Sequence, residues 1–283
     1  MKENIELLAS YWTLAGGAVP HTDHEYSPFD FRGRVEEARK AGFKGVGIWH
    51  ADLNHTLKKR SLKEMKQILD DNGMKYLELE FLRDWFVEGE LKEQSDVARQ
   101  ELLDASQALG ASHVKVGDFE RKKTAMPKLI EAFGELCAEA AKYRARIGFE
   151  LMPFGMIDSL KDSLTMIEGA GAKNGGIILD LWHIAKLRIP YEDVARIPAK
   201  YLVSVELNDG TFEAPWSLHE DTINHRRFCG EGEFDVKGFI QAVRSAGYAG
   251  HFGIEVLSEE LREKSLKELT IRAFETTMAQ FRE

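Results

Sequence analysis

Four acidic residues stand where short runs of apolar residues end. The four segments are Ile-Gly-Phe-Glu150, Ile-Ile-Leu-Asp180, Val-Ser-Val-Glu206 and Phe-Gly-Ile-Glu255. A carboxylate buried at the end of an apolar strand is costly unless a cation or a hydrogen-bonding partner lies beside it. If the ends of these strands meet, the four carboxylates predict a binding site for a divalent metal ion.

The elements that position these carboxylates follow from a repeated junction, in which a helical stretch ends in a glycine just before a short apolar strand. The glycines of this junction are Gly42, Gly73, Gly110, Gly171 and Gly247. The residue just past a helix often needs a positive φ, which glycine adopts without strain. Each interval fits one or two strand-and-helix units, so the chain is a βα repeat, which indicates a parallel sheet covered by helices.

Short strands rich in Val, Ile and Leu are predicted at 5–12, 44–49, 75–81, 112–117, 146–152, 176–181, 201–207 and 251–257. Apolar residues at helical spacing lie between them, for example Leu129, Phe133 and Leu136. Ser61 with Glu64 matches the capping box of a helix start, as does a second such pair near the C-terminus. The alternation predicts α/β class, with one (β/α)8 TIM barrel domain over residues 1–283. The active site of such a barrel forms at the C-terminal ends of its strands, where the four carboxylates lie.

With these residues in view, the sequence resembles the sugar-phosphate isomerase/epimerase family of xylose-isomerase-like TIM barrels over essentially the whole chain. The matching motifs are Glu150, Leu-Asp180-Leu-Trp-His183, Glu206-Leu-Asn-Asp209, Gly230-Glu-Gly232-Glu-Phe-Asp235 and Gly253-Ile-Glu255. The resemblance implies that Glu150, Asp180 and Glu255 are metal ligands and that His183 faces the substrate.

The chain departs from this family at the seventh strand, where the ligand is usually a histidine, sometimes a glutamine, and here is Glu206. Four carboxylates around a divalent ion leave excess negative charge, which a proton or a cationic neighbour must offset. The candidates for that role are Lys115, Arg226, Arg227 and His183. An all-oxygen ligand set favours Mn²⁺ or Mg²⁺ over Zn²⁺. The substitution leaves the exact reaction open.

Further side chains are expected to line the barrel mouth and to bind a small-molecule sugar or polyol. The candidates for substrate binding are His50, Glu80, Lys115, Trp182 and Arg227. The tryptophans of the chain lie near strand ends, where indole faces pack on the C–H surface of a sugar, although some are expected in the core. Lys115 points either into the mouth, which we favour, or out to a helix. The segment around Arg227 resembles one that contacts substrate in relatives; the alternative is a solvated basic turn.

Composition argues against several other classes. A formal net charge of -9 disfavours a nucleic-acid partner, because phosphate binding needs a basic face. The charged N-terminus lacks the apolar stretch of a signal peptide, and no apolar run approaches the roughly 18 residues of a membrane helix. Cys137 and Cys229 lie in unlike contexts, which indicates neither a disulfide framework nor a thiolate metal site. We therefore expect a cytoplasmic protein without a membrane partner, and the sequence leaves homo-oligomerisation open.

The expected function is a metal-dependent sugar isomerase or epimerase of carbohydrate metabolism. The metal would stabilise an enediolate, and Glu150 and Glu255 would exchange the proton as acid and base. If the enediolate instead expels a leaving group, the enzyme is a dehydratase or lyase of the inosose or dehydroshikimate type. An abasic-site DNA endonuclease shares the barrel but needs more histidine ligands and a basic rim, so it is less favoured. The intact acidic set argues against a non-catalytic sugar-binding barrel.

Overall fold

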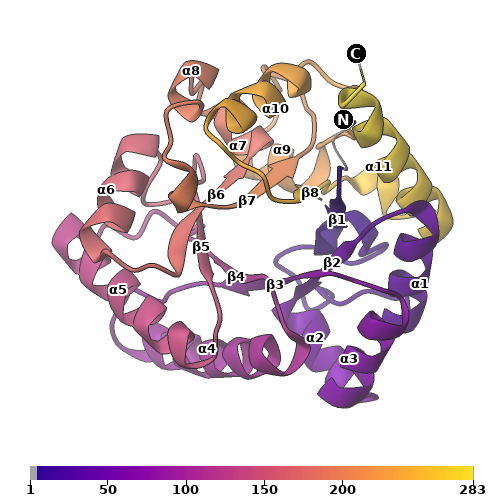
Figure 1. Cartoon of the computed structure of the whole chain (residues 1–283), viewed down its shortest axis with the longest axis horizontal. Helices are drawn as coiled ribbons and strands as arrows, with labels where there is room; N and C mark the ends of the chain where they lie inside the picture. The colour runs from indigo at the N-terminus through magenta and orange to yellow at the C-terminus, as the bar shows by residue number, and fades with distance from the viewer. Residues whose placement is uncertain (1–4, 283) are drawn as a thin grey trace.

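The computed structural model describes residues 5–282, so the first four residues of the charged N-terminal segment lie outside the described residues. Within this range eight parallel strands close into a barrel, in chain order, with the last strand paired to the first (Figure 1). The strands are β1 (Leu7–Ala9), β2 (Gly45–Trp49), β3 (Tyr76–Leu82), β4 (His113–Val116), β5 (Ile147–Glu150), β6 (Gly175–Asp180), β7 (Leu202–Leu207) and β8 (Phe252–Ile254). The predicted (β/α)8 TIM barrel is confirmed.

Helices form a ring around the outside of the barrel (Figure 1). They are α1 (Phe31–Ala41), α2 (His50–Leu57), α3 (Leu62–Asp71), α4 (Glu90–Leu109), α5 (Met126–Lys142), α6 (Leu160–Ala170), α7 (Leu181–Lys186), α8 (Tyr191–Val194), α9 (Leu218–Asn224), α10 (Val236–Ser245) and α11 (Leu266–Gln280). Short 3-10 helices are η1 (Tyr11–Leu14), η2 (Ala199–Tyr201) and η3 (Glu259–Leu261). No helix within residues 5–282 is long and apolar enough to cross a membrane.

Local sequence signals account for most element boundaries. All five junction glycines have positive φ, and the capping boxes at Ser61 and Ser265 both form. The first strand is shorter than predicted: the backbone N–H of Tyr11 donates to Glu80 Oε1 at 3.0 Å, and the chain turns into η1. Glu80, which was predicted to bind substrate, therefore also helps to end β1.

The barrel interior leaves room for charged side chains near the C-terminal ends of its strands. Gly47 on β2 lies against Glu80, and a Cβ added there would be 2.5 Å from Glu80 Oε1. Gly253 on β8 lies against Glu206, and a Cβ there would be 3.0 Å from Glu206 Cγ. Both glycines allow a close approach that a larger residue would prevent. The apolar core lies between the barrel and its helices, as at Phe133 of α5.

Candidate active site

Four carboxylates from neighbouring strand ends converge at the mouth of the barrel. Glu150 ends β5, Asp180 ends β6, Glu206 lies on β7, and Glu255 follows β8 directly. Asp180 and Glu206 are register partners across the β6–β7 pair, which places them side by side. One carboxylate oxygen from each of the four lies within 4.8 Å of the others, and all four side chains are buried. The structure therefore brings together the four residues that the sequence predicted as metal ligands.

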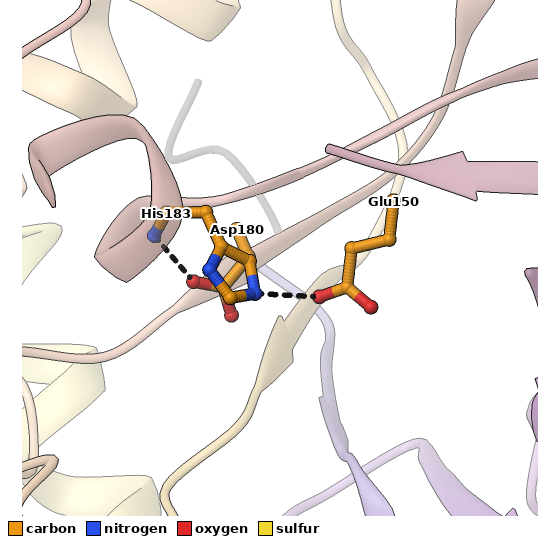
Figure 2. A group of neighbouring side chains, drawn as sticks. All are labelled: Glu150, Asp180 and His183. Atoms are coloured by element: carbon orange, nitrogen blue, oxygen red, sulfur yellow. Dashed lines mark hydrogen bonds and ion pairs between the residues drawn. The ribbon is translucent and has the colours of Figure 1, made fainter. Parts of the chain in front are cut away.

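His183 joins this cluster because Asp180 caps the helix that carries it. Asp180 Oδ1 accepts a hydrogen bond from the backbone N–H of His183 at 3.2 Å, which starts α7. The His183 ring then faces Glu150, with its Nε2 atom 3.4 Å from Glu150 Oε1 (Figure 2). The Asp-x-x-His spacing thus has a structural cause, since one turn of capped helix carries the imidazole back to the carboxylates. Glu150, Asp180 and His183 form a second group able to hold a metal ion.

Lys115 of β4 points inward and lies within the carboxylate cluster. Its ammonium nitrogen is 2.6 Å from Glu206 Oε1 and 2.9 Å from Glu255 Oε1. It is also 3.4 Å from Glu80 Oε2 and 4.0 Å from Glu150 Oε2. Burial alone would lower the pKa of Lys115, but the surrounding carboxylates, led by Glu150 and Glu206, hold it well above its ordinary value. Lys115 is therefore a permanent buried cation at the site.

Arg226 supplies a second buried cation, from the segment between α9 and α10. Its Nη1 atom donates to Asp180 Oδ2 at 2.9 Å and to Glu255 Oε2 at 3.1 Å. Its guanidinium also lies over the Trp182 ring, 5.3 Å from the ring centroid. Thr222 accepts two further hydrogen bonds from it, through its hydroxyl. Arg226 thus links two of the four carboxylates through Nη1.

Other buried polar groups complete the cluster, and most of them carried no functional prediction. Ser10 donates to Glu206 Oε1 at 3.0 Å, and Asn208 donates to Asp180 Oδ2 at 2.9 Å. Glu78 lies two residues before Glu80 on β3, on the same face, and bonds to His113 at 2.8 Å. The Leu-Glu-Leu-Glu alternation of β3 could have identified Glu78, because strand residues two apart share a face.

The environment shifts the pKa values of these carboxylates in different directions. Burial raises the pKa of Glu206 well above its ordinary value, and nearby Glu255 raises it further, whereas Lys115 acts in the opposite sense. Burial likewise raises the pKa of Glu255. Burial also acts to raise the pKa of Asp180, but Arg226 and His183 hold this pKa below the ordinary value. Opposite pKa shifts within one cluster are the pattern expected where carboxylates outnumber the cations near them.

The residues present fit a hard divalent cation. Every oxygen donor of the four-residue set is a carboxylate, the ligand type that Mg²⁺ and Mn²⁺ prefer. Two buried oxygens of the set, Glu150 Oε1 and Glu206 Oε2, have no hydrogen-bond partner among the described residues. A buried carboxylate oxygen without a partner is costly, and a metal ion would remove that cost. A bound ion would also offset part of the excess negative charge.

A pocket opens above the carboxylates, with an empty volume of about 500 Å³ that includes space open to solvent. This size suits a small-molecule ligand. Its floor contains Glu80, Glu150, His183, Arg226 and Glu255. Its walls and rim are formed by Trp12, Pro20, His21, Glu25, Trp49, Phe81, Phe119, Met152, Phe154, His219, Thr222, Ile223 and Leu257. The rim residues, including His21 and His219, carried no functional prediction from the sequence.

Of the five predicted substrate-binding residues, Glu80 alone lines this pocket. His50 begins α2 and turns outward, with its Nε2 atom 2.6 Å from Glu101 of α4. Trp182 is fully buried behind Arg226. Arg227 is exposed, and its guanidinium bonds to the backbone of Glu231. Glu80 does line the pocket, and Lys115 lies beneath it.

Arg226, rather than Arg227, enters the site for a reason that lies in the backbone. Arg227 pairs with Asp209 through a two-way backbone bridge, with both N–H···O distances at 2.9 Å. Successive side chains of an extended segment point to opposite sides. With Arg227 turned to solvent, its neighbour Arg226 must point into the barrel mouth.

Comparison with known proteins identifies the family to which this chain belongs. The family model for the xylose isomerase-like TIM barrel matches residues 35–274, and the chain belongs to this family. Two 3-dehydroshikimate dehydratases are similar, one from Pseudomonas aeruginosa at 28% identity over 239 residues and one from Pseudomonas putida at 26% over 240. Each match covers 81% of this chain but 36% of the relative, so the chain spans about a third of the length of these curated relatives.

Solved structures agree on the fold. The IOLI protein with a binding zinc atom superposes with a TM-score of 0.85 at 17% identity, covering 98% of both chains. A xylose isomerase-like TIM barrel/4-hydroxyphenylpyruvate dioxygenase fusion protein gives the same TM-score at 20% identity, covering 98% of this chain and 42% of that one. D-allulose 3-epimerase from Methylomonas sp. gives 0.73 at 15% identity, covering 98% of both chains.

Proposed function

We propose that this chain is a divalent-metal-dependent isomerase or epimerase that moves a proton on the carbon next to the carbonyl of a keto-sugar or cyclic polyol. The observation that carries the proposal is the convergence of four buried carboxylates, two of which, Glu150 and Glu255, line a pocket. The residues that would hold the ion are Glu150, Asp180, Glu206 and Glu255. When bound, Mn²⁺ or Mg²⁺ would polarise the carbonyl and stabilise negative charge on adjacent oxygens.

In this proposal, Glu150 and Glu255 exchange the substrate proton. Both line the pocket, and they come from β5 and from the end of β8. Burial raises the pKa of Glu255, so this carboxyl retains a proton more readily than an ordinary glutamate, as a general acid must. Glu150 Oε1 has no hydrogen-bond partner within the described chain, which leaves a lone pair free to accept a proton. His183 lies beside Glu150 and would orient a substrate hydroxyl.

The pocket lining favours an uncharged substrate. Its walls carry the aromatic side chains Trp12, Trp49, Phe81, Phe119 and Phe154, which suit the C–H faces of a sugar or polyol ring. Its arginine, Arg226, is already bonded to Asp180 and Glu255. A carboxylate or phosphate on the substrate would meet this acidic floor unfavourably.

The second candidate function is dehydration of a keto-polyol, of the inosose or dehydroshikimate type. The observation that favours it is the similarity to the two 3-dehydroshikimate dehydratases. Glu80 adds a further carboxylate to the pocket floor, and burial raises its pKa well above the ordinary value. A protonated carboxyl at this position could protonate a departing hydroxyl.

Solvent exchange distinguishes the two candidates. The Mn²⁺-loaded protein would be incubated in D₂O with a panel of ketoses, inososes and 3-dehydroshikimate, and followed by NMR. An isomerase or epimerase should form a new isomer and incorporate deuterium from the solvent at the carbon next to the carbonyl. A dehydratase should instead yield a product that has lost water. Glu150→Gln should abolish both outcomes. Asp52→Asn, which alters a buried carboxylate outside the site, should preserve them. Cleavage of abasic duplex DNA, without change in any carbohydrate, would contradict the proposal.

A further inference from the structure

We propose that Lys115 is a built-in counter-cation of the metal site, which stabilises the protein without metal and lowers its affinity for the divalent ion. The inference deepens the proposed function and rests on it. It concerns how strongly the site binds metal, which is separate from the chemistry performed there.

Lys115 contacts one of the two carboxylate oxygens of Glu206 and one of the two of Glu255. Lys115 Nζ bonds to Glu206 Oε1 at 2.6 Å and to Glu255 Oε1 at 2.9 Å. The second oxygen of Glu206, Oε2, is buried without a hydrogen-bond partner in residues 5–282. Lys115 therefore neutralises one side of Glu206 and leaves the other side available to an ion.

The ammonium group is held in place from below by two further carboxylates. Glu80 Oε2 lies 3.4 Å from Lys115 Nζ, and Glu78 Oε1 lies 3.9 Å from it. Glu80 is fixed in turn by the backbone N–H of Tyr11, and Glu78 by the ring of His113. Lys115 is almost fully buried, so solvent does not screen its charge. The cation cannot move away from Glu206 and Glu255 without leaving all of these partners.

A fixed positive charge at this position has two opposing effects. Without metal it offsets the cost of burying Glu206 and Glu255 close together. With metal it repels the incoming divalent ion, because like charges a few ångströms apart interact strongly in a buried site. Removing the charge while keeping side-chain length should therefore weaken the metal-free fold and tighten metal binding.

The test compares Lys115→Met with Lys186→Met. Lys186 is the matched control, because it is also buried and ion-paired, to Asp221 at 2.5 Å, but does not contact the four carboxylates. Mn²⁺ affinity would be measured by titration calorimetry, and unfolding temperature with and without Mn²⁺. Lys115→Met should bind Mn²⁺ at least about tenfold more tightly and show a larger Mn²⁺-induced rise in unfolding temperature. Lys186→Met should lose stability but keep the wild-type affinity.

Two outcomes separate this inference from the proposed function. Mn²⁺ binding by the wild type with equal or weaker binding by Lys115→Met would overturn the role of Lys115 alone. Failure of every protein in the set to bind Mn²⁺ would contradict the proposed function as well. If Lys115→Met cannot be purified without metal, Lys115→Met/Glu206→Gln removes one charge of each sign and should fold. A double variant as unstable as Lys115→Met would also overturn the inference.

Discussion

Arg226 Nη1 lies 2.9 Å from Asp180 Oδ2, so a buried guanidinium is bonded directly to one of the four carboxylates at the barrel mouth. The next residue, Arg227, is exposed, and its guanidinium donates to the backbone carbonyl of Glu231. Adjacent arginines thus have opposite environments, and they form a matched pair for mutation.

We predict that Arg226→Lys lowers kcat/KM about 10- to 100-fold, because a lysine keeps the charge but cannot bond to Asp180 and Glu255 while the Thr222 hydroxyl holds its other nitrogens in place. Arg227→Lys should leave kcat/KM close to wild type. Steady-state kinetics on both variants checks the prediction. Equal losses of kcat/KM in the two variants would show that the contacts of Arg226 with Asp180 and Glu255 do not support catalysis.

Much of this arrangement could be predicted from the sequence, for a physical reason. The ends of parallel barrel strands meet at one mouth, so carboxylates at four successive strand ends had to lie near one another. The assignment of Arg227 failed because the backbone bridge from Asp209 to Arg227, between segments far apart in the chain, decides which arginine points inward. The prediction for His50 was wrong because this residue begins α2, which carries the ring out to Glu101. Such tertiary contacts leave no local sequence signal.

Substitution of His183 tests whether this residue contacts the substrate or binds the metal. We predict that His183→Asn reduces kcat about 10²- to 10⁴-fold, the range for loss of one proton-transfer or hydroxyl-orienting group, while Mn²⁺ content stays at the wild-type level. His219→Asn, at the pocket rim, should have a much smaller effect. Elemental analysis accompanies the kinetics. A parallel loss of Mn²⁺ and activity in His183→Asn would instead make His183 a ligand, with Glu150 and Asp180.

Gly232 is predicted to be required by packing. A Cβ at this position would lie 2.3 Å from Asp209 Oδ1. That carboxylate accepts hydrogen bonds from the backbone of Gly230 and Phe234 and so fixes the Gly-Glu-Gly loop. Gly232→Ala should therefore reduce the free energy of unfolding by about 1–3 kcal/mol, the usual cost of overpacking.

The control for Gly232 is Gly33 of α1, where an added Cβ would meet nothing within 4 Å. Gly33→Ala should raise the free energy of unfolding by up to about 1 kcal/mol, because alanine favours the helix. Urea unfolding measures both variants. A neutral Gly232→Ala would mean that the loop relaxes and that packing does not explain the motif.

His251 should make stability depend on pH. Burial, with a smaller contribution from His113, lowers the pKa of His251 to about 4. The unfolded chain binds this proton more tightly, with a pKa of about 6.5, so the contribution of His251 is fully present above about pH 6.5 and is lost as pH falls towards 4. The loss amounts to about 3 kcal/mol.

Urea unfolding between pH 4 and pH 7 measures this contribution by difference. His251→Gln should lose less stability than wild type over the interval, by about the amount given above. His24→Gln, at an exposed position, should follow the wild-type curve. Parallel curves for wild type and His251→Gln would show that His251 is not the group responsible.

Binding of one divalent ion by Glu150, Asp180, Glu206 and Glu255 is tested most directly by the metal content of the protein after loading. Elemental analysis of protein loaded with Mn²⁺ and then dialysed should give about one ion per chain, the stoichiometry of a single oxygen-ligand site. Glu150→Gln/Asp180→Asn should retain almost none, whereas Asp52→Asn should match wild type. Mn²⁺ content in Glu150→Gln/Asp180→Asn equal to that of wild type would show that these carboxylates do not bind the ion.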